Sequence, residues 1–91
     1  MSYSYRSWTI RDHMLEALRL YVSHGLEPGD FLKAVLANDF QEAVARADDD
    51  NIQQLPAFAA YVYNEIPSTC HGSYDLVNAW VAQKGEQNAP T

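Results

Sequence analysis

The stretch TIRDHMLEALRLYVSHG, residues 9–25, decides the fold class of this 91-residue chain. Thr9 followed by Asp12 has the spacing of a helix N-cap with an acidic capping partner. Gly25 supplies the left-handed residue that commonly closes a helix. We therefore expect an amphipathic helix that starts at the Thr9 cap and ends near His24. Its apolar residues recur at helical intervals: Ile10, Met14, Ala17, Leu18, Tyr21 and Val22.

Two short helices are predicted downstream of this one. The turn at residues 27–30 contains a proline and acidic groups, which favour a helix start, and the second helix runs through Ala37. Because apolar residues cover much of its circumference, we expect it to be the most buried helix. Asp39 then occupies an N-cap position, with Glu42 as its capping-box partner. The third helix is predicted to direct a stripe inward: Phe40, Ala43, Val44 and Ala47.

The rest of the chain predicts two more helices. Residues 48–51 offer caps for a fourth one, but Pro56 lies inside its pattern. Because proline in a helix interior costs about 3 kcal/mol, we expect a short first turn and then a main helix over residues 56–64. Residues 67–72 are predicted as a loop, Ser73 as the cap of a last helix through Gln83, and Gly85 as its end.

The chain as a whole is predicted to be all-α. We expect a compact single domain of about five short helices over residues 9–85. An N-terminal aromatic arm at residues 1–8 precedes it, and a flexible polar tail at residues 86–91 follows it. No alternating pattern is long enough to predict a strand inside the domain.

Charge bears most directly on function. Twelve Asp and Glu residues face six Lys and Arg residues, which gives a net charge of −6. Such a surface is repelled by nucleic-acid phosphates and anionic membranes and is attracted to basic proteins. The single cysteine, Cys70, forms no internal disulfide, and no apolar run approaches the ~20 residues of a membrane span. We expect a protein that is not secreted and that binds a basic protein surface.

Seven acidic residues are candidates for contact with a partner. The run Asp48, Asp49 and Asp50 resembles a row of phosphates that would dock on Lys and Arg side chains. Carboxylates that cap a helix start are the simpler explanation for one or two of them. A second group lies at the starts of the second and third helices, and it forms one acidic face with the run if those starts share a side: Glu27, Asp30, Asp39 and Glu42.

Aromatic residues near the N-terminus are the other candidates. Tyr3, Tyr5 and Trp8 alternate with polar residues. They either pack on the domain as an extended arm or act as anchors for a partner, because Tyr and Trp are enriched at interface hot spots. Such alternation also suits a strand added to a partner's sheet. We expect Trp8 to pack on its own domain and leave both alternatives for Tyr3 and Tyr5.

The chain lacks a recognisable catalytic or metal-binding motif. The soft-ligand candidates are His13, His24, Cys70 and His71, and they lack the paired spacing of structural zinc sites. Nothing in the sequence matches a nucleophile elbow, a phosphate loop or a dinucleotide fingerprint. We therefore expect a non-enzymatic protein without a metal or another cofactor.

Turns, caps and core residues between His24 and Trp80 carry a resemblance to a known group of proteins. Its main segments are HG at 24–25, PGDFL at 28–32, AVL at 34–36, ND at 38–39, RAD at 46–48, LP at 55–56, YVYN at 61–64, PS at 67–68 and Cys70. In these segments the chain resembles small uncharacterised proteins encoded by bacteriophages and prophages. The resemblance covers roughly two thirds of the chain and includes no catalytic signature.

The resemblance implies a viral accessory protein that acts in the host cytoplasm. Such proteins often inhibit host defence or nucleic-acid-processing machinery, and anti-CRISPR proteins are among them. Two alternatives stay open. The first is an assembly module or homo-oligomeric virion-associated protein held together by its Tyr and Trp side chains. The second is a small-ligand-binding protein that uses the loop at Cys70 and His71.

Overall fold

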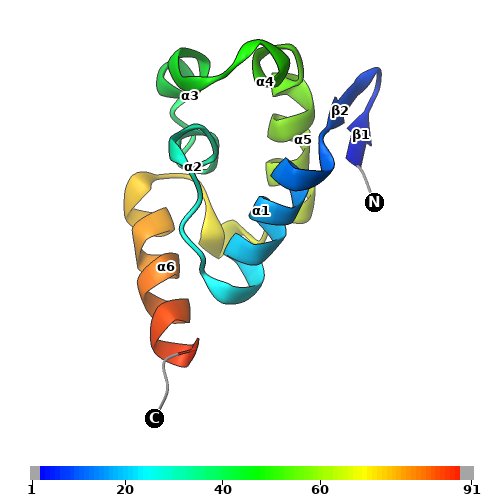
Figure 1. Cartoon of the computed structure of the whole chain (residues 1–91). Coiled ribbons are helices and arrows are strands. Elements are labelled where there is room, and N and C mark those ends of the chain that lie inside the picture. Colours follow the sequence, from blue (N-terminus) through cyan, green and yellow to red (C-terminus); the bar gives the residue numbers. More distant parts are fainter. Residues whose placement is uncertain (1–2, 89–91) are drawn as a thin grey trace.

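A short β-hairpin precedes six α-helices in the computed structural model, which describes residues 3–88 and, for 86–88, the backbone only (Figure 1). The predicted all-α class is confirmed as a mostly helical single domain with one two-stranded sheet. The elements are β1 (Tyr3–Tyr5), β2 (Trp8–Ile10), α1 (Asp12–His24), α2 (Asp30–Leu36), α3 (Phe40–Arg46), α4 (Asp49–Gln53), α5 (Leu55–Glu65), the 3₁₀ turn η1 (Ser68–Cys70) and α6 (Tyr74–Asn88).

The core lies where α1, α2, α5 and α6 meet. Helix α2 contributes four buried residues out of seven, in line with its expected burial. The ring of Phe31 in α2 packs edge-on against Phe58 in α5, with ring centroids 5.1 Å apart. Such apolar burial stabilises the fold by roughly 1.5–3 kcal/mol for each large side chain. The largest fully buried side chains are Ile10, Leu15, Leu18, Tyr21, Leu36, Phe58, Cys70 and Val77.

The N-terminal hairpin corrects the prediction for this part of the chain. Tyr3 pairs with Ile10, and Tyr5 pairs with Trp8, in an antiparallel register. The sequence pattern missed these strands because each has only three residues. Thr9 is therefore not the N-cap of α1. Its N–H donates to the side chain of Gln54 at 2.8 Å, which ties β2 to the start of α5.

Helix α1 starts differently from the prediction but ends where it was predicted to end. Arg11 occupies the N-cap position and makes no side-chain capping bond. At the other end, Gly25 adopts the left-handed conformation with φ of 67°. Its N–H donates to the carbonyl of Tyr21 at 2.9 Å, so a carbonyl of the last turn is satisfied. The predicted stop at His24 is confirmed.

The starts of α3, α4 and α5 follow the sequence signals. Asp39 accepts the N–H of Glu42 at 3.2 Å, and Asp48 accepts the N–H of Asn51 at 2.7 Å. The predicted break at Pro56 is confirmed, because α4 ends at Gln53 and α5 begins one residue before the proline. A proline in the first turn leaves no helical hydrogen bond unmade.

The inward stripe predicted for α3 is wrong for two of its members. Ala43 is buried, but Phe40 is 70% exposed and Val44 is 39% exposed. Helix α3 has seven residues and packs mainly against α2, so only a narrow face of it is covered. Ala47, just after the helix, packs partly buried against the core.

Helix α6 starts as predicted and ends later. Ser73 Oγ accepts the N–H of Leu76 at 3.1 Å, which confirms the cap. The helix continues through Gly85 to Asn88, so the predicted end is wrong, and residues 86–88 of the expected tail are helical. One glycine costs a helix only about 0.5–1 kcal/mol, and good helix formers follow it. The remaining tail residues, 89–91, lie outside the described residues. Among residues 3–88, no helix is long and apolar enough to cross a membrane.

Candidate protein-binding surface

The acidic run is partly engaged inside the domain. The guanidinium of Arg11 lies 3.4 Å from Asp48 and 2.6 Å from Asp50, and it donates to the side chain of Asn51 at 3.0 Å. The hydrogen bond from the Asn51 N–H, aided by Arg11, lowers the pKa of Asp48 below its usual value. Asp49 is exposed and has no ion-pair partner among the described residues. One charge of this run therefore remains fully available.

The second acidic group is paired in the same manner. Glu27 pairs with Lys33, while Arg46 bridges Glu42 at 2.6 Å and Asp30 at 3.7 Å. These pairs are largely exposed, and such pairs stabilise a fold by only about 0–1 kcal/mol. Their main consequence is that the local negative charge is reduced.

Asp39 stands apart from those pairs. Besides capping α3, it accepts the hydroxyl of Tyr74 at 2.8 Å, which joins the start of α3 to the start of α6. This hydrogen bond raises the pKa of Tyr74. Asp39 thus serves the fold with both of its carboxylate oxygens.

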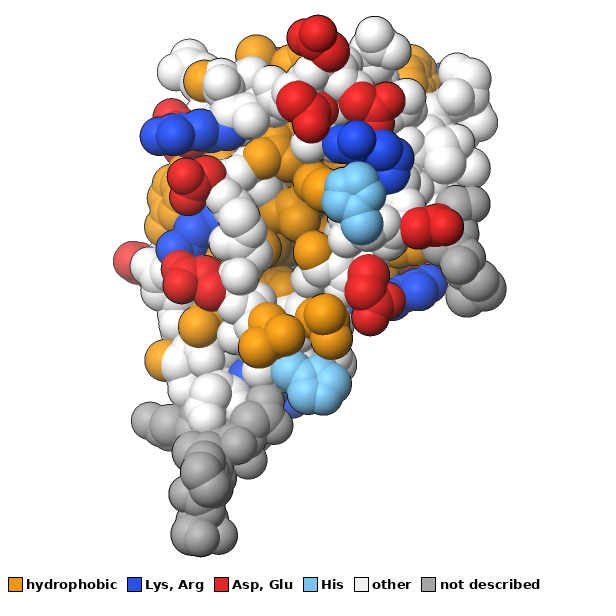
Figure 2. All heavy atoms as spheres, in the orientation of Figure 1, with side chains coloured by type: hydrophobic (Ala, Val, Ile, Leu, Met, Phe, Trp, Pro, Cys, Tyr) orange, Lys and Arg blue, Asp and Glu red, His pale blue; other side chains and the backbone are white. Residues whose placement is uncertain are grey.

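The seven candidate carboxylates keep most of the net charge of the chain. Within the described part of the chain they meet three cations, which leaves 3 − 7 = −4 of the total of −6. Arg46 ends α3 and Asp48 caps α4, so the two acidic groups adjoin at that junction, whereas Asp39 lies at the other end of α3. Figure 2 shows acidic side chains along the upper part of one face with basic side chains between them.

The aromatic arm packs on its own domain. Tyr3 contacts the ring of Tyr61 edge-on at 4.9 Å, and Tyr5 stacks near Trp8 at 6.4 Å. All three arm aromatics are partly buried against the core. The expectation for Trp8 is confirmed, and Tyr3 and Tyr5 have contacts that a partner would have to replace. For the assembly alternative, the exposed Tyr63 is therefore a more accessible anchor than the three arm aromatics.

The Cys70–His71 loop separates its two side chains. Cys70 is fully buried, and burial raises the pKa of its thiol, which disfavours a reactive thiolate. His71 is half-buried and lines a surface groove instead. Among the described side chains, those of residues 3–85, no group of three or more His, Cys, Asp or Glu residues could hold a metal ion.

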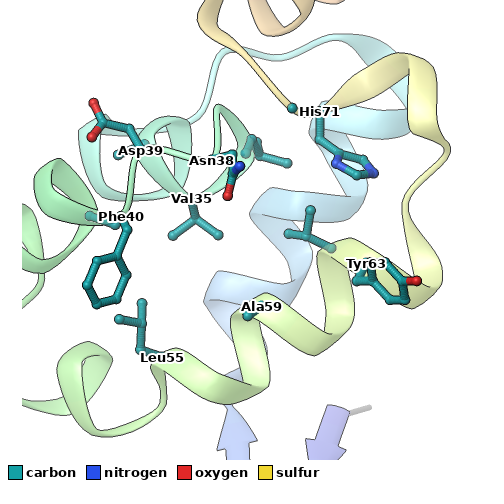
Figure 3. A pocket seen from close by; sticks show the side chains of 13 residues that line it. Val35, Asn38, Asp39, Phe40, Leu55, Ala59, Tyr63 and His71 are labelled. Atoms are coloured by element: carbon teal, nitrogen blue, oxygen red, sulfur yellow. The ribbon is translucent and has the colours of Figure 1, made fainter.

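The groove is the main feature that the sequence patterns missed. It has a volume of about 480 Å³ and lies between α2, α3, α5 and the loop at residues 71–72. Val35 points into it, Phe40 lies beside Leu55 at one end, and Tyr63 and His71 stand at the other (Figure 3). The exposed fraction of the Tyr63 side chain is 83%, so this ring is almost free. The groove is predominantly apolar and open to solvent.

One signal in the sequence could have identified this groove. Leu55, Ala59 and Tyr63 recur at i, i+4 and i+8 in α5 and form a second apolar stripe beside the buried one. A helix that is apolar on more than its core face has a further surface to cover. Phe40 carried no such signal, because its spacing with Ala43 also fits an inward face.

No protein-family model, curated protein or solved structure matches the chain.

Proposed function

We propose that this chain is a non-enzymatic binding protein. Its acidic surface, which consists of the seven candidate carboxylates in and beside α2, α3 and α4, docks on a basic surface of a protein partner. The observation that carries the proposal is the charge of −4 that the seven carboxylates retain beside their three internal cations. Complementary charge accelerates and orients association with a basic partner. Asp49 is the residue most available for this contact, because it is exposed and unpaired within the described part of the chain.

The partner that we propose is a host defence or nucleic-acid-processing protein, met in the host cytoplasm. Support comes from the resemblance to phage and prophage proteins. It also comes from the negative charge of the chain, because a basic surface with which a partner binds nucleic-acid phosphates also attracts carboxylates. Anti-CRISPR inhibition is the most specific form of this proposal. Plaque counts on bacteria with an active CRISPR system test it, and expression of the chain is expected to restore phage growth. Unchanged plaque counts would argue against that form only.

Capture from a bacterial lysate tests the acidic docking surface. Asp49→Lys reverses a charge in the first turn of α4 without removing a carboxylate that Arg11 holds. Asp75→Lys is the matched control, because Asp75 is exposed and lies in the first turn of α6. Tagged wild type and both variants are compared at about 50 and about 300 mM salt, since surface charge is screened over this range.

The expected result is one specific partner that wild type and Asp75→Lys capture at low salt. Its recovery falls by about tenfold with Asp49→Lys and at the higher salt, because the contact is electrostatic. Equal recovery with both variants, with circular dichroism showing that both are folded, would remove the acidic surface from the contact. No specific partner in any lane would contradict the binding function itself.

A further inference from the structure

We infer that the groove between α2, α3 and α5 receives an amphipathic helix of another protein, whose apolar side chains enter the groove and whose Lys or Arg residues flank it. This inference rests on the proposed function, because the helix would belong to the same partner. It adds an apolar anchor to the electrostatic contact.

The groove has room for side chains of a helix that packs closely against it. Ala34 and Ala43 line the groove but are buried, whereas Ala59 is exposed and its small side chain allows another backbone to approach. Phe40 and Tyr63 stand at opposite ends with exposed fractions of 70% and 83%. Large exposed apolar side chains beside a hollow mark interaction sites, because covering them removes apolar surface from water. The volume of about 480 Å³ falls within the usual range for binding pockets.

The spacing of the groove residues favours a helix over an extended chain. The stripe of Leu55, Ala59 and Tyr63 spans two turns of α5, a length of about 12 Å. A helix laid along this stripe would place anchors at i, i+3 or i+4 and i+7 against it, as in other helix-in-groove complexes. A β-strand added to the groove would need a sheet edge for its backbone hydrogen bonds, and the groove lies between helices and the loop at residues 71–72.

The negative charge near the groove favours a partner helix that carries Lys or Arg residues. The described residues that line the groove include Asp39 and no Lys or Arg. Figure 3 shows the Asp39 carboxylate at the rim and turned away from the apolar space, so a cation would meet it from the flank of the incoming helix. The neighbouring pairs of Arg46 with Glu42 and Asp30 add a further −1. A second copy of this chain would bring another −6 against this rim, which disfavours self-association.

Two model peptides test the groove directly. One is an amphipathic Leu/Lys helix of about 18 residues, and the other has the same Leu pattern with Glu in place of Lys. Ala59→Arg fills the groove with a cation, and Ala59 is exposed, so the variant is expected to fold. Ala79→Arg is the matched control, because it makes the same change on the exposed side of α6. Binding is followed by ¹H–¹⁵N NMR titration.

The Leu/Lys peptide is expected to bind at one saturable site and to shift the amide signals of residues 34–43, 55–63 and 71–72. Ala59→Arg weakens its binding by about tenfold or more, Ala79→Arg leaves it unchanged, and the Leu/Glu peptide binds about tenfold more weakly than Leu/Lys. Shifts elsewhere, or equal binding by the two variants, would overturn the groove site. So would a concentration-dependent dimer that Ala59→Arg abolishes, because the occupant would then be a second copy.

The two proposals fail in distinguishable ways. If Asp49→Lys loses the lysate partner while Ala59→Arg keeps it, the acidic surface binds and the groove inference is wrong. If Ala59→Arg loses that partner and the peptide shifts map to the groove, the inference holds whatever Asp49→Lys does. If the lysate contains no partner and neither peptide binds, both proposals are wrong.

Discussion

Tyr21 is a buried residue of α1 that forms hydrogen bonds with both η1 and α6. Its hydroxyl donates to the carbonyl of Cys70 at 2.6 Å, and its own carbonyl accepts the indole N–H of Trp80 at 3.0 Å. The side chain is fully buried. Burial raises the pKa of Tyr21 far above its ordinary value, and the neighbouring Cys70 adds to the rise. This residue therefore couples α1 to both η1 and α6.

The hydroxyl of Tyr21 can be tested by removing it. Tyr21→Phe leaves the buried carbonyl of Cys70 without its donor, and we expect a loss of about 1–3 kcal/mol in the free energy of unfolding. Urea denaturation at pH 7 measures this loss. Phe is the appropriate variant because it keeps the ring that fills the core. An unchanged midpoint and slope would show that the hydrogen bond contributes nothing net.

The raised pKa of Tyr21 also predicts the response to alkali. Above the ordinary tyrosine pKa of 10.0, the unfolded chain releases this proton while the folded chain keeps it. The free energy of unfolding therefore falls as pH rises, by at most about 1.4 kcal/mol per pH unit for this group. Tyr21→Phe is expected to show a shallower decline in urea denaturation between about pH 9 and pH 11. Parallel declines would contradict the assignment.

Alanine substitutions at Gly25 and Gly85 are expected to change the free energy of unfolding in opposite directions. Gly25 has φ of +67°, and a Cβ there would lie 2.3 Å from the Cβ of Lys84. We expect Gly25→Ala to lower the free energy of unfolding by more than about 2 kcal/mol, from backbone strain and the clash. Gly85→Ala meets no atom of the described residues within 4 Å and lies in α6, so it should stabilise by about 0.5–1 kcal/mol. Thermal denaturation of both variants checks these opposite signs.

At the scale of elements, α4 depends on interactions outside itself. It has five residues, which is too short for an isolated helix to be stable in water. Asp48 caps its N-terminus, and Arg11 from the start of α1 holds Asp48 and Asp50. The buried Asn51 also receives a hydrogen bond from Arg11. The acidic run is therefore part of the contact between two elements as well as a surface charge.

The charge of Asp48 can be separated from its capping oxygen. Asp48→Asn keeps an oxygen for the Asn51 N–H and removes the titration. Because the folded-state pKa of Asp48 is lowered, its contribution is present above the unfolded value of 3.8 and is lost as pH falls through the folded value. We expect stability to fall more steeply in wild type than in Asp48→Asn from about pH 4 downward. Urea denaturation measures both curves, and identical slopes would refute the prediction.

At the scale of the whole molecule, one core integrates the hairpin with the helices. Ile10 ends β2 and is fully buried, while the hairpin rests against α5 through Tyr3 and Tyr61. Side chains on the outer surface of the helices, such as Ile52 in α4, are more than a third exposed. The N-terminal strands are therefore integral to the fold, whereas the outer side of α3 and α4 contributes less to the core.

Alanine substitutions at Ile10 and Ile52 compare how much β2 and α4 contribute to stability. Ile10→Ala leaves a cavity in the core, and we expect it to cost about 2–5 kcal/mol. Ile52→Ala removes the same atoms from a 37% exposed side chain, and we expect it to cost less than about 1 kcal/mol. Urea denaturation of the two variants provides the comparison. Similar costs for both would mean that the hairpin is not integrated into the core.

Most features set by neighbouring residues could be predicted from the sequence; the exceptions are the Thr9 cap, which strand pairing replaces, and the stop at Gly85, which α6 passes through. The caps at Asp39, Asp48 and Ser73, the stop at Gly25 and the break at Pro56 all appear at the predicted places. Each of these signals acts within about one helical turn, so the local sequence contains the whole interaction. The net charge of −6 was likewise determined by composition alone.

Features that join distant residues were decided only by the tertiary structure. Arg11 neutralises part of the acidic run from 37 residues away, which no spacing rule could show. Periodicity assigned Phe40 to the interior, yet packing against α2 leaves it exposed beside the groove. The sequence determined which helices form and the sign of the surface, whereas the packing of those helices decided which charges and apolar side chains remain free, because that depends on which faces meet.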